Sequence, residues 1–249
     1  MAPAGVDVDP VIVVLVHLCS FITLRLKNHT RFSVLAQLKP SMEQGDTNGN
    51  NLCFFCYPSS ERQILYEDDE VYVIPSLGHF TPGYLLIVYK DHRDCFADVV
   101  SESHQKVKDM VRRVLTEEYG SCCFFEHGRV GSCFEKGTHK ICYHAHLHCL
   151  PIETDFTDQV SKNYDWIRIE DWTDIEEYRE KYPHYFYTEM NSGNKSYFIV
   201  DDPPERQYLR RQSCKALGIA EERANWKEHP YRHRMKKTAK RLKDSFPKL

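Results

Sequence analysis

The pattern of apolar and polar positions predicts an α+β chain in which one amphipathic helix interrupts a series of strands. Residues 63–77 are typical of two short strands around an acidic turn, and the apolar run 83–90 predicts a third strand, buried on both faces. Apolar residues recur at spacings of three and four over 96–119, which predicts a helix with one core-facing stripe. Further strands are expected at 121–128 and 142–152. This order favours an antiparallel meander sheet with the helix packed on one face.

The expected helix divides its residues between a core side and a solvent side. Its core stripe contains Val107, Met110, Val111, Val114 and Leu115. The basic residues that we expect on the outside are Lys106, Lys108, Arg112 and Arg113. Such a division is typical of a helix that packs on a sheet with one side only.

Beyond Pro151 the chain becomes rich in Tyr and Trp, which indicates a second unit that docks on the first. Two apolar runs on either side of residues 191–194 predict a hairpin. A helix is predicted over 203–218, because Asp202 before a proline is a favourable helix start and Gly218 a favourable end. The expected organisation is a leader and linker (1–51), a main α+β domain (52–152) and a C-terminal α/β extension with a hairpin and basic helices (153–249).

The composition sets limits on partners. The chain has 249 residues, 41% hydrophobic content and a formal net charge of −3, so no general attraction to nucleic acid or membranes is expected. The apolar run 11–24 is shorter than the roughly 20 residues that span a bilayer. Asp7 and Asp9 before it disfavour a signal peptide. The run is either a strand or helix packed on the domain, or a poorly ordered leader.

Ten cysteines spread over a chain of this length are more typical of reduced thiols, with one metal site among them, than of a disulfide scaffold. We therefore expect a reducing, cytoplasmic compartment and no membrane partner. The cysteines that we assign to the core are Cys95, Cys122, Cys123, Cys142 and Cys149.

Three histidines alternate along the strand expected at 142–152. His144, His146 and His148 share one face of that strand, because successive side chains of a β-strand point to opposite faces. Their imidazoles have three uses: metal ligation, acid–base or nucleophilic chemistry on phosphate, and polar edge packing. Burial of three titratable rings without partners is costly, and the strand offers no carboxylate to orient metal ligands. Chemistry on phosphate is therefore favoured.

The stretch HAHLHCLP, residues 144–151, resembles the motif of the histidine triad (HIT) superfamily. The segments CFFC, EDDEVYVIPS, GYLLIVYKDH and FFEHG are similar to that family in order and spacing, so the likeness covers residues 52–152. It implies a HIT-like fold. It also implies an enzyme, a nucleotide hydrolase or nucleotidyl transferase that acts at the α-phosphate of a dinucleoside polyphosphate or a nucleoside phosphoramidate.

The resemblance implies a role for each histidine. His146 would be the nucleophile that holds the nucleotidyl group covalently. His148 would stabilise the charge on a phosphate oxygen or protonate the leaving group. His144 completes the catalytic triad. The residues expected to contact the nucleotide are His127, Gly128, Thr138 and His148.

Cys53 and Cys56 are a separate signal, because two thiolates at this spacing make half of a tetrahedral zinc site. In zinc-bearing members of the family that the motif resembles, the set is completed by positions that are His92 and His144 in this sequence. The resemblance thus implies a closed, structural zinc site. The alternative is a pair of buried free thiols.

Some positions depart from the family pattern. Glu126 and Ile141 stand where many members have the Asn and Ser that bind phosphate, and Pro75-Ser76 stand where a ribose-binding acid is usual. A carboxylate beside a phosphate would repel it. We therefore expect Glu126 to weaken binding, to point away from the ligand, or to bind ribose hydroxyls.

The extension leaves a second function open. Its pattern DDPPERQYLRRQ…LG…NWK is similar to the tails of larger HIT proteins and faintly to CwfJ-type splicing factors. The alternative function is thus a CwfJ-like module that binds nucleotide or RNA with little catalysis. Residues 227–249 are rich in Lys and Arg, and they either grip a polyanion such as RNA or form a solvated helical face. A homodimer, or replacement of the second subunit by the extension, is also open.

Overall fold

The computed structural model describes residues 53–58, 63–130 and 144–247. The chain divides into two units, Met1–Gly49 and Asn50–Leu249, and every described residue belongs to the second. The predictions for the leader therefore lie outside the described residues. Among the residues that are described, no helix is long and apolar enough to cross a membrane.

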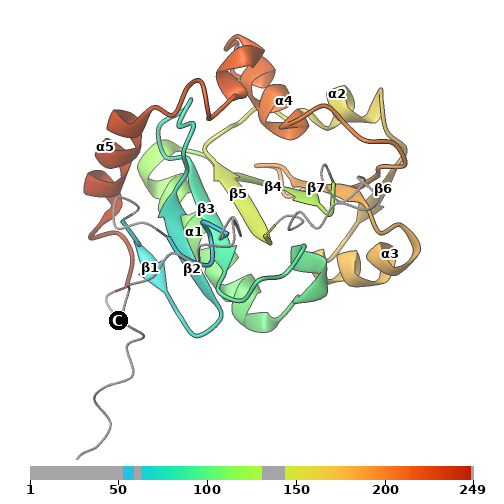
Figure 1. Cartoon of the computed structure of the whole chain (residues 1–249), viewed down its shortest axis with the longest axis horizontal. Helices are drawn as coiled ribbons and strands as arrows, with labels where there is room; N and C mark the ends of the chain where they lie inside the picture. Colours follow the sequence, from blue (N-terminus) through green and yellow to red (C-terminus); the bar gives the residue numbers. More distant parts are fainter. Residues whose placement is uncertain (1–52, 59–62, 131–143, 248–249) are drawn as a thin grey trace, which may run out of the picture. The chain divides into compact units, whose positions relative to one another are not determined.

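An antiparallel sheet of eight strands forms the centre of the described part of the chain (Figure 1). Its strands, in spatial order, are β1 (Tyr66–Glu67), β2 (Val71–Pro75), β3 (Leu85–Tyr89), β5 (His146–Leu150), β4 (Cys123–Gly128), β7 (Tyr185–Glu189), β8 (Lys195–Ile199) and β6 (Trp166–Ile169). Every neighbouring pair is antiparallel. The predicted α+β class with an antiparallel sheet is confirmed, and the predicted hairpin is the β7–β8 pair.

The extension continues this sheet directly. Strand β7 pairs with β4 from Phe124↔Glu189 to Gly128↔Tyr185, so β4 has a neighbour on each side. The boundary expected near residue 152 falls between β5 and the strands that complete the same sheet. The histidine strand β5 lies between β3 and β4, which places it inside the sheet.

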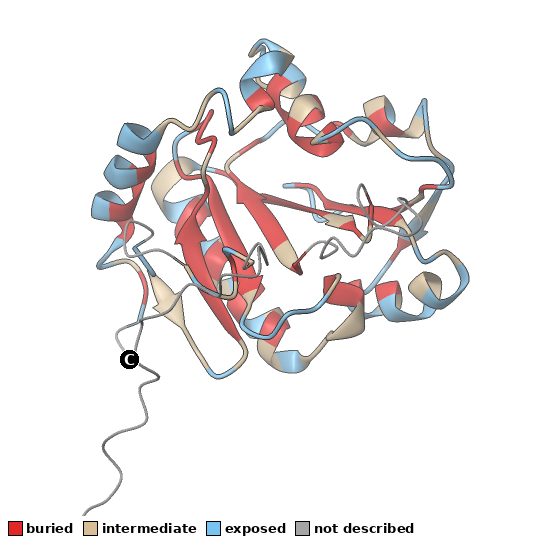
Figure 2. Ribbon diagram, viewed as in Figure 1, coloured by how far each residue is buried: buried red, intermediate tan, exposed pale blue. Residues whose placement is uncertain are grey.

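Helices cover both faces of the sheet. Helices α1 (Glu102–Tyr119) and α3 (Ile175–Lys181) contribute to the core on one face, and α2 (Thr157–Ser161) and α4 (Tyr208–Ala216) contribute to the core on the other. Helix α5 (Arg232–Leu242) contacts β2. Short 3-10 turns occur at Phe96–Asp98, Trp172–Asp174 and Glu221–Ala224. We call the two sides of the sheet the α1 face and the α4 face. Figure 2 shows the central strands buried and the outer sides of the helices exposed.

Alternation along β4 decides which side chains reach which face. Phe124 packs in the core of the α1 face, whereas Phe125 packs in the core of the α4 face. Phe125 lies opposite His148 in the register of the β4–β5 pair. Side chains two residues apart in a strand share a face. His127 therefore joins Phe125 on the α4 face, and Glu126 joins Phe124 on the α1 face.

Capping residues determine where helix α1 begins and ends. Fewer of its residues face solvent than predicted. The Ser101 hydroxyl accepts a hydrogen bond from the His104 N–H at 3.3 Å, and Gly120 ends the helix with φ 90°. The prediction that Lys108 lies outside is wrong, because its side chain is 1% exposed. Its ammonium lies 4.5 Å from the centre of the Trp172 ring, so the extension covers this side of the helix.

Helix α4 begins later than predicted. The expected start at Asp202 is wrong, because the helix begins at Tyr208, after Gln207 at φ 61°. Pro203 precedes another proline, and the residue before a proline is disfavoured in the helical region. The predicted end is confirmed, since the helix stops just before Gly218, which has φ 66°.

Candidate active site and metal cluster

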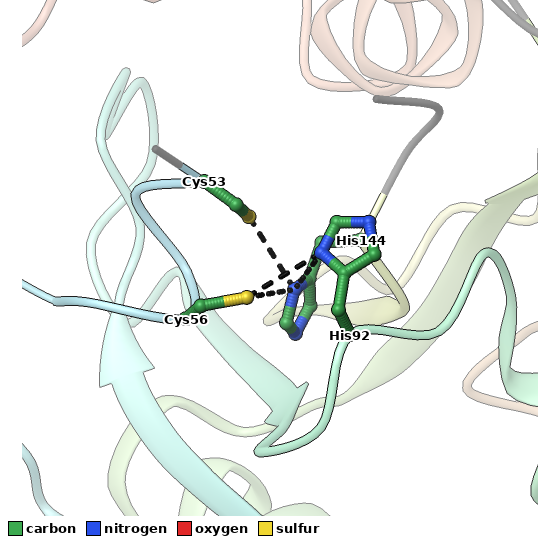
Figure 3. Close-up of side chains that lie close together, drawn as sticks. All are labelled: Cys53, Cys56, His92 and His144. Carbon is green, nitrogen blue, oxygen red and sulfur yellow. Dashed lines mark hydrogen bonds between the residues drawn. The ribbon is translucent and has the colours of Figure 1, made fainter. Parts of the chain in front are cut away.

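Four residues that the sequence assigns to a metal site meet next to the start of β5 (Figure 3). Cys53, Cys56, His92 and His144 each offer one ligand atom, and these atoms all lie within 4.8 Å of one another. His144 Nδ1 lies 3.4 Å from each of the two sulfur atoms and 3.2 Å from His92 Nδ1. Three segments that are far apart in the sequence therefore converge on one point.

The donor set fits a metal ion. In a tetrahedral zinc site with two sulfur and two nitrogen ligands, neighbouring ligand atoms are about 3.3–3.8 Å apart. The His144 Nε2–H donates to the Tyr89 carbonyl oxygen at 2.5 Å, which leaves the Nδ1 lone pair on the side of the two sulfur atoms. The Nδ1 atoms of His144 and His92 lie 3.2 Å apart. At this distance two nitrogen lone pairs would repel each other unless a proton or a cation lies between them. These four residues could therefore hold a metal ion.

His146 stands at the beginning of β5 on the α4 face. Its Nδ1–H donates to the His144 carbonyl oxygen at 2.7 Å, so a neutral ring carries its lone pair on Nε2. The ring centres of Phe55 and His148 each lie 4.7 Å from the centre of the His146 ring. Backbone and neighbouring rings thus orient a side chain that is suited to act as a base or a nucleophile.

His148 is buried in the same face, with 4% of its surface exposed. Its Nδ1 lies 2.7 Å from the Tyr84 hydroxyl, and its ring stacks on Phe125 with centres 4.5 Å apart. Burial holds the pKa of His148 well below its ordinary value, and the positive charge of nearby Arg210 lowers it further. The ring is therefore neutral near pH 7 and can donate one hydrogen bond.

His127 lies beside His148, with ring centres 5.8 Å apart. Its Nε2 accepts a hydrogen bond at 3.2 Å from the backbone N–H of Leu209, in the first turn of α4. That N–H has no acceptor within the helix, so the histidine satisfies it. Burial lowers the pKa of His127 to about 3. A neutral imidazole thus connects β4 to the extension on the α4 face.

Glu126 points to the α1 face, away from the three histidines. Its carboxylate accepts hydrogen bonds from the Phe96 N–H and the Tyr185 hydroxyl, both at 2.7 Å. Burial raises the pKa of Glu126 to about 7, although these two donors partly offset the effect. The Glu126 carboxylate is therefore directed away from the face that carries His146 and His148.

The other expected nucleotide contacts have different places. A Cβ added at Gly128 would lie 2.1 Å from the Tyr185 ring, so the missing side chain of Gly128 makes room for that ring. Thr138 and Ile141 lie outside the described residues. Of the members of this set that the structure describes, His127 and His148 have side chains that lie close together.

Sequence reasoning missed two residues of this face. Tyr84, at the start of the third strand segment, contacts His148, and Arg210 of α4 contacts Tyr84 at 2.7 Å. These two residues are 126 positions apart, so no local spacing connects them. The signal available in the sequence would have been an Arg within a predicted helix that has one apolar side.

Of three comparisons with known proteins, the search of solved structures found matches. A scan against protein-family models and a search of curated proteins found no match. One similar structure is a HIT-like protein involved in cell-cycle regulation from Bartonella henselae, with an unknown ligand. It has 19% identity and a TM-score of 0.28, and the match covers 36% of this chain and 69% of that one.

Another similar structure is a hypothetical histidine triad nucleotide-binding protein from Sulfolobus tokodaii strain 7. It has 14% identity and a TM-score of 0.32, and the match covers 77% of this chain and 97% of that one. Both structures bear the name of the family that the stretch HAHLHCLP resembles. The fold described above, an antiparallel sheet with α1 on one face and the histidine strand inside it, agrees with the α+β class predicted from the sequence.

Proposed function

We propose that the chain is a nucleotide hydrolase or nucleotidyl transferase that acts at the α-phosphate of a dinucleoside polyphosphate or a nucleoside phosphoramidate. The observation that carries the proposal is the hydrogen bond from His146 Nδ1–H to the His144 carbonyl oxygen at 2.7 Å. It leaves the lone pair of a neutral imidazole on Nε2, and a neutral imidazole is the form that attacks phosphorus.

The proposed reaction has two displacements. First, His146 Nε2 bonds to the α-phosphorus while the bond to the leaving group breaks, and the leaving group departs with the electron pair; an amine leaving group takes a proton from solvent as it departs. Then the oxygen of a water molecule bonds to phosphorus, the N–P bond breaks with its electrons returning to Nε2, and the water loses a proton to solvent. His148 donates a hydrogen bond to a non-bridging oxygen throughout. An acceptor other than water would give a transferase.

We propose that His127 and His148 contact the nucleotide, with Gly128 and Thr138 as further contacts. The proximity of the two imidazoles on one face supports the first pair. Because the pKa of each ring is low, both imidazoles would be neutral. They would therefore bind the nucleotide through hydrogen bonds and not through a positive charge.

The metal cluster is assigned to zinc. Two thiolates and two imidazoles fill all four positions of a tetrahedral site, which is typical of a structural ion. Bound there, the ion would tie residues 53–58 to the start of the histidine strand. His144 would then serve the metal, while His146 and His148 serve the phosphate. A cytoplasmic location stays a prediction.

Incubation with adenosine phosphoramidates and diadenosine polyphosphates tests the reaction. Wild-type protein should release AMP, and mass spectrometry of the quenched mixture should detect an adenylate on His146. His146→Ala should lower turnover by about 10³-fold or more. His233→Ala, which changes an exposed histidine of α5, is the control and should leave turnover unchanged. Turnover that survives in His146→Ala would remove the mechanism.

Native mass spectrometry tests the metal. The wild-type chain should carry one zinc ion, and Cys56→Ser should lose it. The control Cys214→Ala removes a core thiol outside the cluster and should keep the ion. Equal metal content in all three proteins would reject this set of ligands.

The CwfJ-like alternative makes a different prediction. Helix α5 exposes basic residues to solvent, among them Arg232, Lys236, Lys237 and Lys240. If the alternative is correct, RNA binding that weakens with salt should disappear when these residues are changed to Gln, and wild-type protein should not hydrolyse nucleotides.

A further inference from the structure

Arg210 is a buried cation that the reaction proposed above does not use. It is 4% exposed, and it pairs with no carboxylate of the described part of the chain. Its Nε donates to the Ala224 carbonyl oxygen at 3.0 Å, and its Nη2 donates to the Gly78 carbonyl oxygen at 2.9 Å. The shortest contact of the remaining nitrogen, Nη1, is 2.7 Å to the Tyr84 hydroxyl oxygen.

Tyr84 connects this contact to His148. The Tyr84 oxygen lies 2.7 Å from His148 Nδ1. A guanidinium only donates, so the Tyr84 oxygen accepts from Arg210 and its single proton needs another acceptor. The Ser76 hydroxyl also interacts with Tyr84, but within the described ranges His148 Nδ1, at 2.7 Å, is the acceptor at short hydrogen-bond distance from this hydroxyl. The proton arrangement therefore leaves Nδ1 without hydrogen, and a neutral ring then carries its hydrogen on Nε2.

We propose that Arg210 and Tyr84 are positioning residues that hold His148 in the Nε2–H tautomer. The use of that Nε2–H rests on the proposed function, in which it donates to a non-bridging phosphate oxygen. The opposite tautomer would present a lone pair to the phosphate, and two lone pairs repel. The extension, through α4, would thus determine whether the third histidine of the strand is a donor.

Arg210 is closely fitted to its surroundings. Gly78 has φ 69°, and a Cβ at this position would lie 2.2 Å from Arg210 Nη2, so a glycine is required beside the guanidinium. The Gly78 N–H donates to the Pro230 carbonyl oxygen at 3.0 Å. The Arg210 guanidinium also lies 5.0 Å from the centre of the Tyr84 ring. These contacts leave the guanidinium little freedom to turn away from Tyr84.

The neutrality of His148 makes its tautomer well defined. Burial and the surrounding positive charge lower the pKa of His148. A protonated ring would carry hydrogen on both nitrogens and would have no tautomer to select. At neutral pH, the contact with Tyr84 therefore decides between two neutral forms.

Nitrogen-15 NMR of the full-length chain with labelled histidine tests the proposal without substrate. The His148 signals, assigned by their loss in His148→Gln, should show Nδ1 without hydrogen and Nε2 with hydrogen. In Tyr84→Phe the ring keeps its size but loses the hydroxyl, so both tautomers should appear. Wild-type signals with hydrogen on Nδ1, or an unchanged pattern in Tyr84→Phe, would overturn the proposal.

Kinetics give a second readout. Tyr84→Phe should lower kcat about tenfold while KM changes less than about twofold, because the donor acts mainly in the transition state. Arg210→Met should lower kcat similarly, and Arg210→Lys, which keeps a cationic donor, should recover part of the loss. Arg211→Gln, one residue along α4, is the matched control and should equal wild type.

The two proposals fail in different ways. If wild-type protein hydrolyses no nucleotide, the proposed function is rejected, but the NMR pattern still decides the tautomer. If hydrolysis occurs and Tyr84→Phe keeps full kcat with one tautomer, the positioning role is rejected alone. Thermal unfolding of each variant must stay cooperative. Should Arg210→Met not fold, Tyr84→Phe, which retains every contact of the guanidinium except one hydroxyl, decides the question.

Discussion

Among the residues that the structure describes, each face of the sheet buries one cation, and the two faces balance its charge differently. On the α1 face, Lys108 is 1% exposed and its ammonium lies 2.5 Å from a Glu189 carboxylate oxygen. On the α4 face, Arg210 is 4% exposed, and its partners are backbone oxygens and the Tyr84 hydroxyl. Uncharged acceptors can satisfy the hydrogen bonds of a guanidinium, but they do not neutralise it.

Buried acids follow the same division. The two buried carboxylates of the described residues are Glu126 and Glu189, and both point to the α1 face. The imidazoles of His127, His146 and His148, which face α4, are accompanied by a buried cation and, within the described ranges, by no buried carboxylate. The α1 face therefore neutralises its charge internally, while the α4 face has the charge balance that suits an anionic ligand.

Breaking the ion pair of the α1 face should have the largest effect on stability. Glu189 accepts hydrogen bonds from Lys108, Arg112 and the Tyr187 hydroxyl at 2.5 to 2.6 Å. Burial is the largest single influence and would raise the pKa of Glu189, but Lys108, the Tyr187 hydroxyl and Arg112 together lower it below its ordinary value, so the carboxylate is ionised. Glu189→Gln leaves that ammonium buried without a charge partner, so we expect a loss of about 3–5 kcal/mol in the free energy of unfolding, measured in urea.

The control for this variant is an exposed pair. Glu170 lies 3.4 Å from Arg168, and both side chains are largely exposed. Glu170→Gln should change the free energy of unfolding by less than about 0.5 kcal/mol. A Glu189→Gln variant as stable as this control would show that the buried pair does not hold α1 to the extension.

The sequence alone was sufficient for the elements whose pattern is local. The two strands around the acidic turn, the strand at 83–90, helix α1 and the β7–β8 hairpin follow from apolar periodicity and turn residues, and the structure confirms them. The grouping of four potential metal ligands also followed from the sequence, because one spacing indicated two of them and the resemblance to a family motif indicated the other two.

The sequence alone could not predict the burial of residues that are covered by a distant segment of the chain. Lys108 has the spacing of a solvent-facing residue, and it is buried because Trp172 and β7 cover that side of α1. The alternation of side chains along a strand places Glu126 on the opposite face from its two neighbours in β4. Which of the two faces it occupies depends on where the histidine strand packs. Arg210 reaches Tyr84 across 126 positions of the chain, and only the folded arrangement shows this contact.

Glu126 tests the comparison of the two faces through the pH dependence of folding stability. Its pKa, ordinarily near 4.5, is raised by burial to about 7 in the folded chain. Between these values the unfolded chain has released the proton and the folded chain still holds it, so folding stability must fall as pH rises. The loss should begin near pH 4.5, level off above pH 7 and reach at most about 3 kcal/mol.

Urea unfolding from pH 4.5 to 8 measures this effect. Glu126→Gln cannot ionise, so the difference between wild type and variant should shrink or reverse across that range. A flat difference for Glu126→Gln would mean that the carboxylate is as well solvated in the folded chain as in the unfolded one, against its burial on the α1 face.

Uncharged contacts between α5 and the segment before β3 should give the smallest effect. The Thr238 hydroxyl of α5 accepts a hydrogen bond from the Gly83 N–H at 3.2 Å and donates to His79 Nε2 at 2.8 Å. His79 donates from Nδ1 to the Ser76 carbonyl oxygen, and burial lowers its pKa to about 4, so the network carries no charge. Thr238→Val keeps the shape and removes both bonds, which should cost about 1–3 kcal/mol.

Thr238→Ser separates the hydrogen bonds from packing. It retains the hydroxyl and loses one buried methyl group, so its cost should be near 1 kcal/mol or less. Equal losses for Val and Ser would mean that only packing matters there. A loss for Thr238→Val as large as that for Glu189→Gln would contradict the comparison of the two faces, because breaking an uncharged network would then be as costly as leaving a buried charge unpaired.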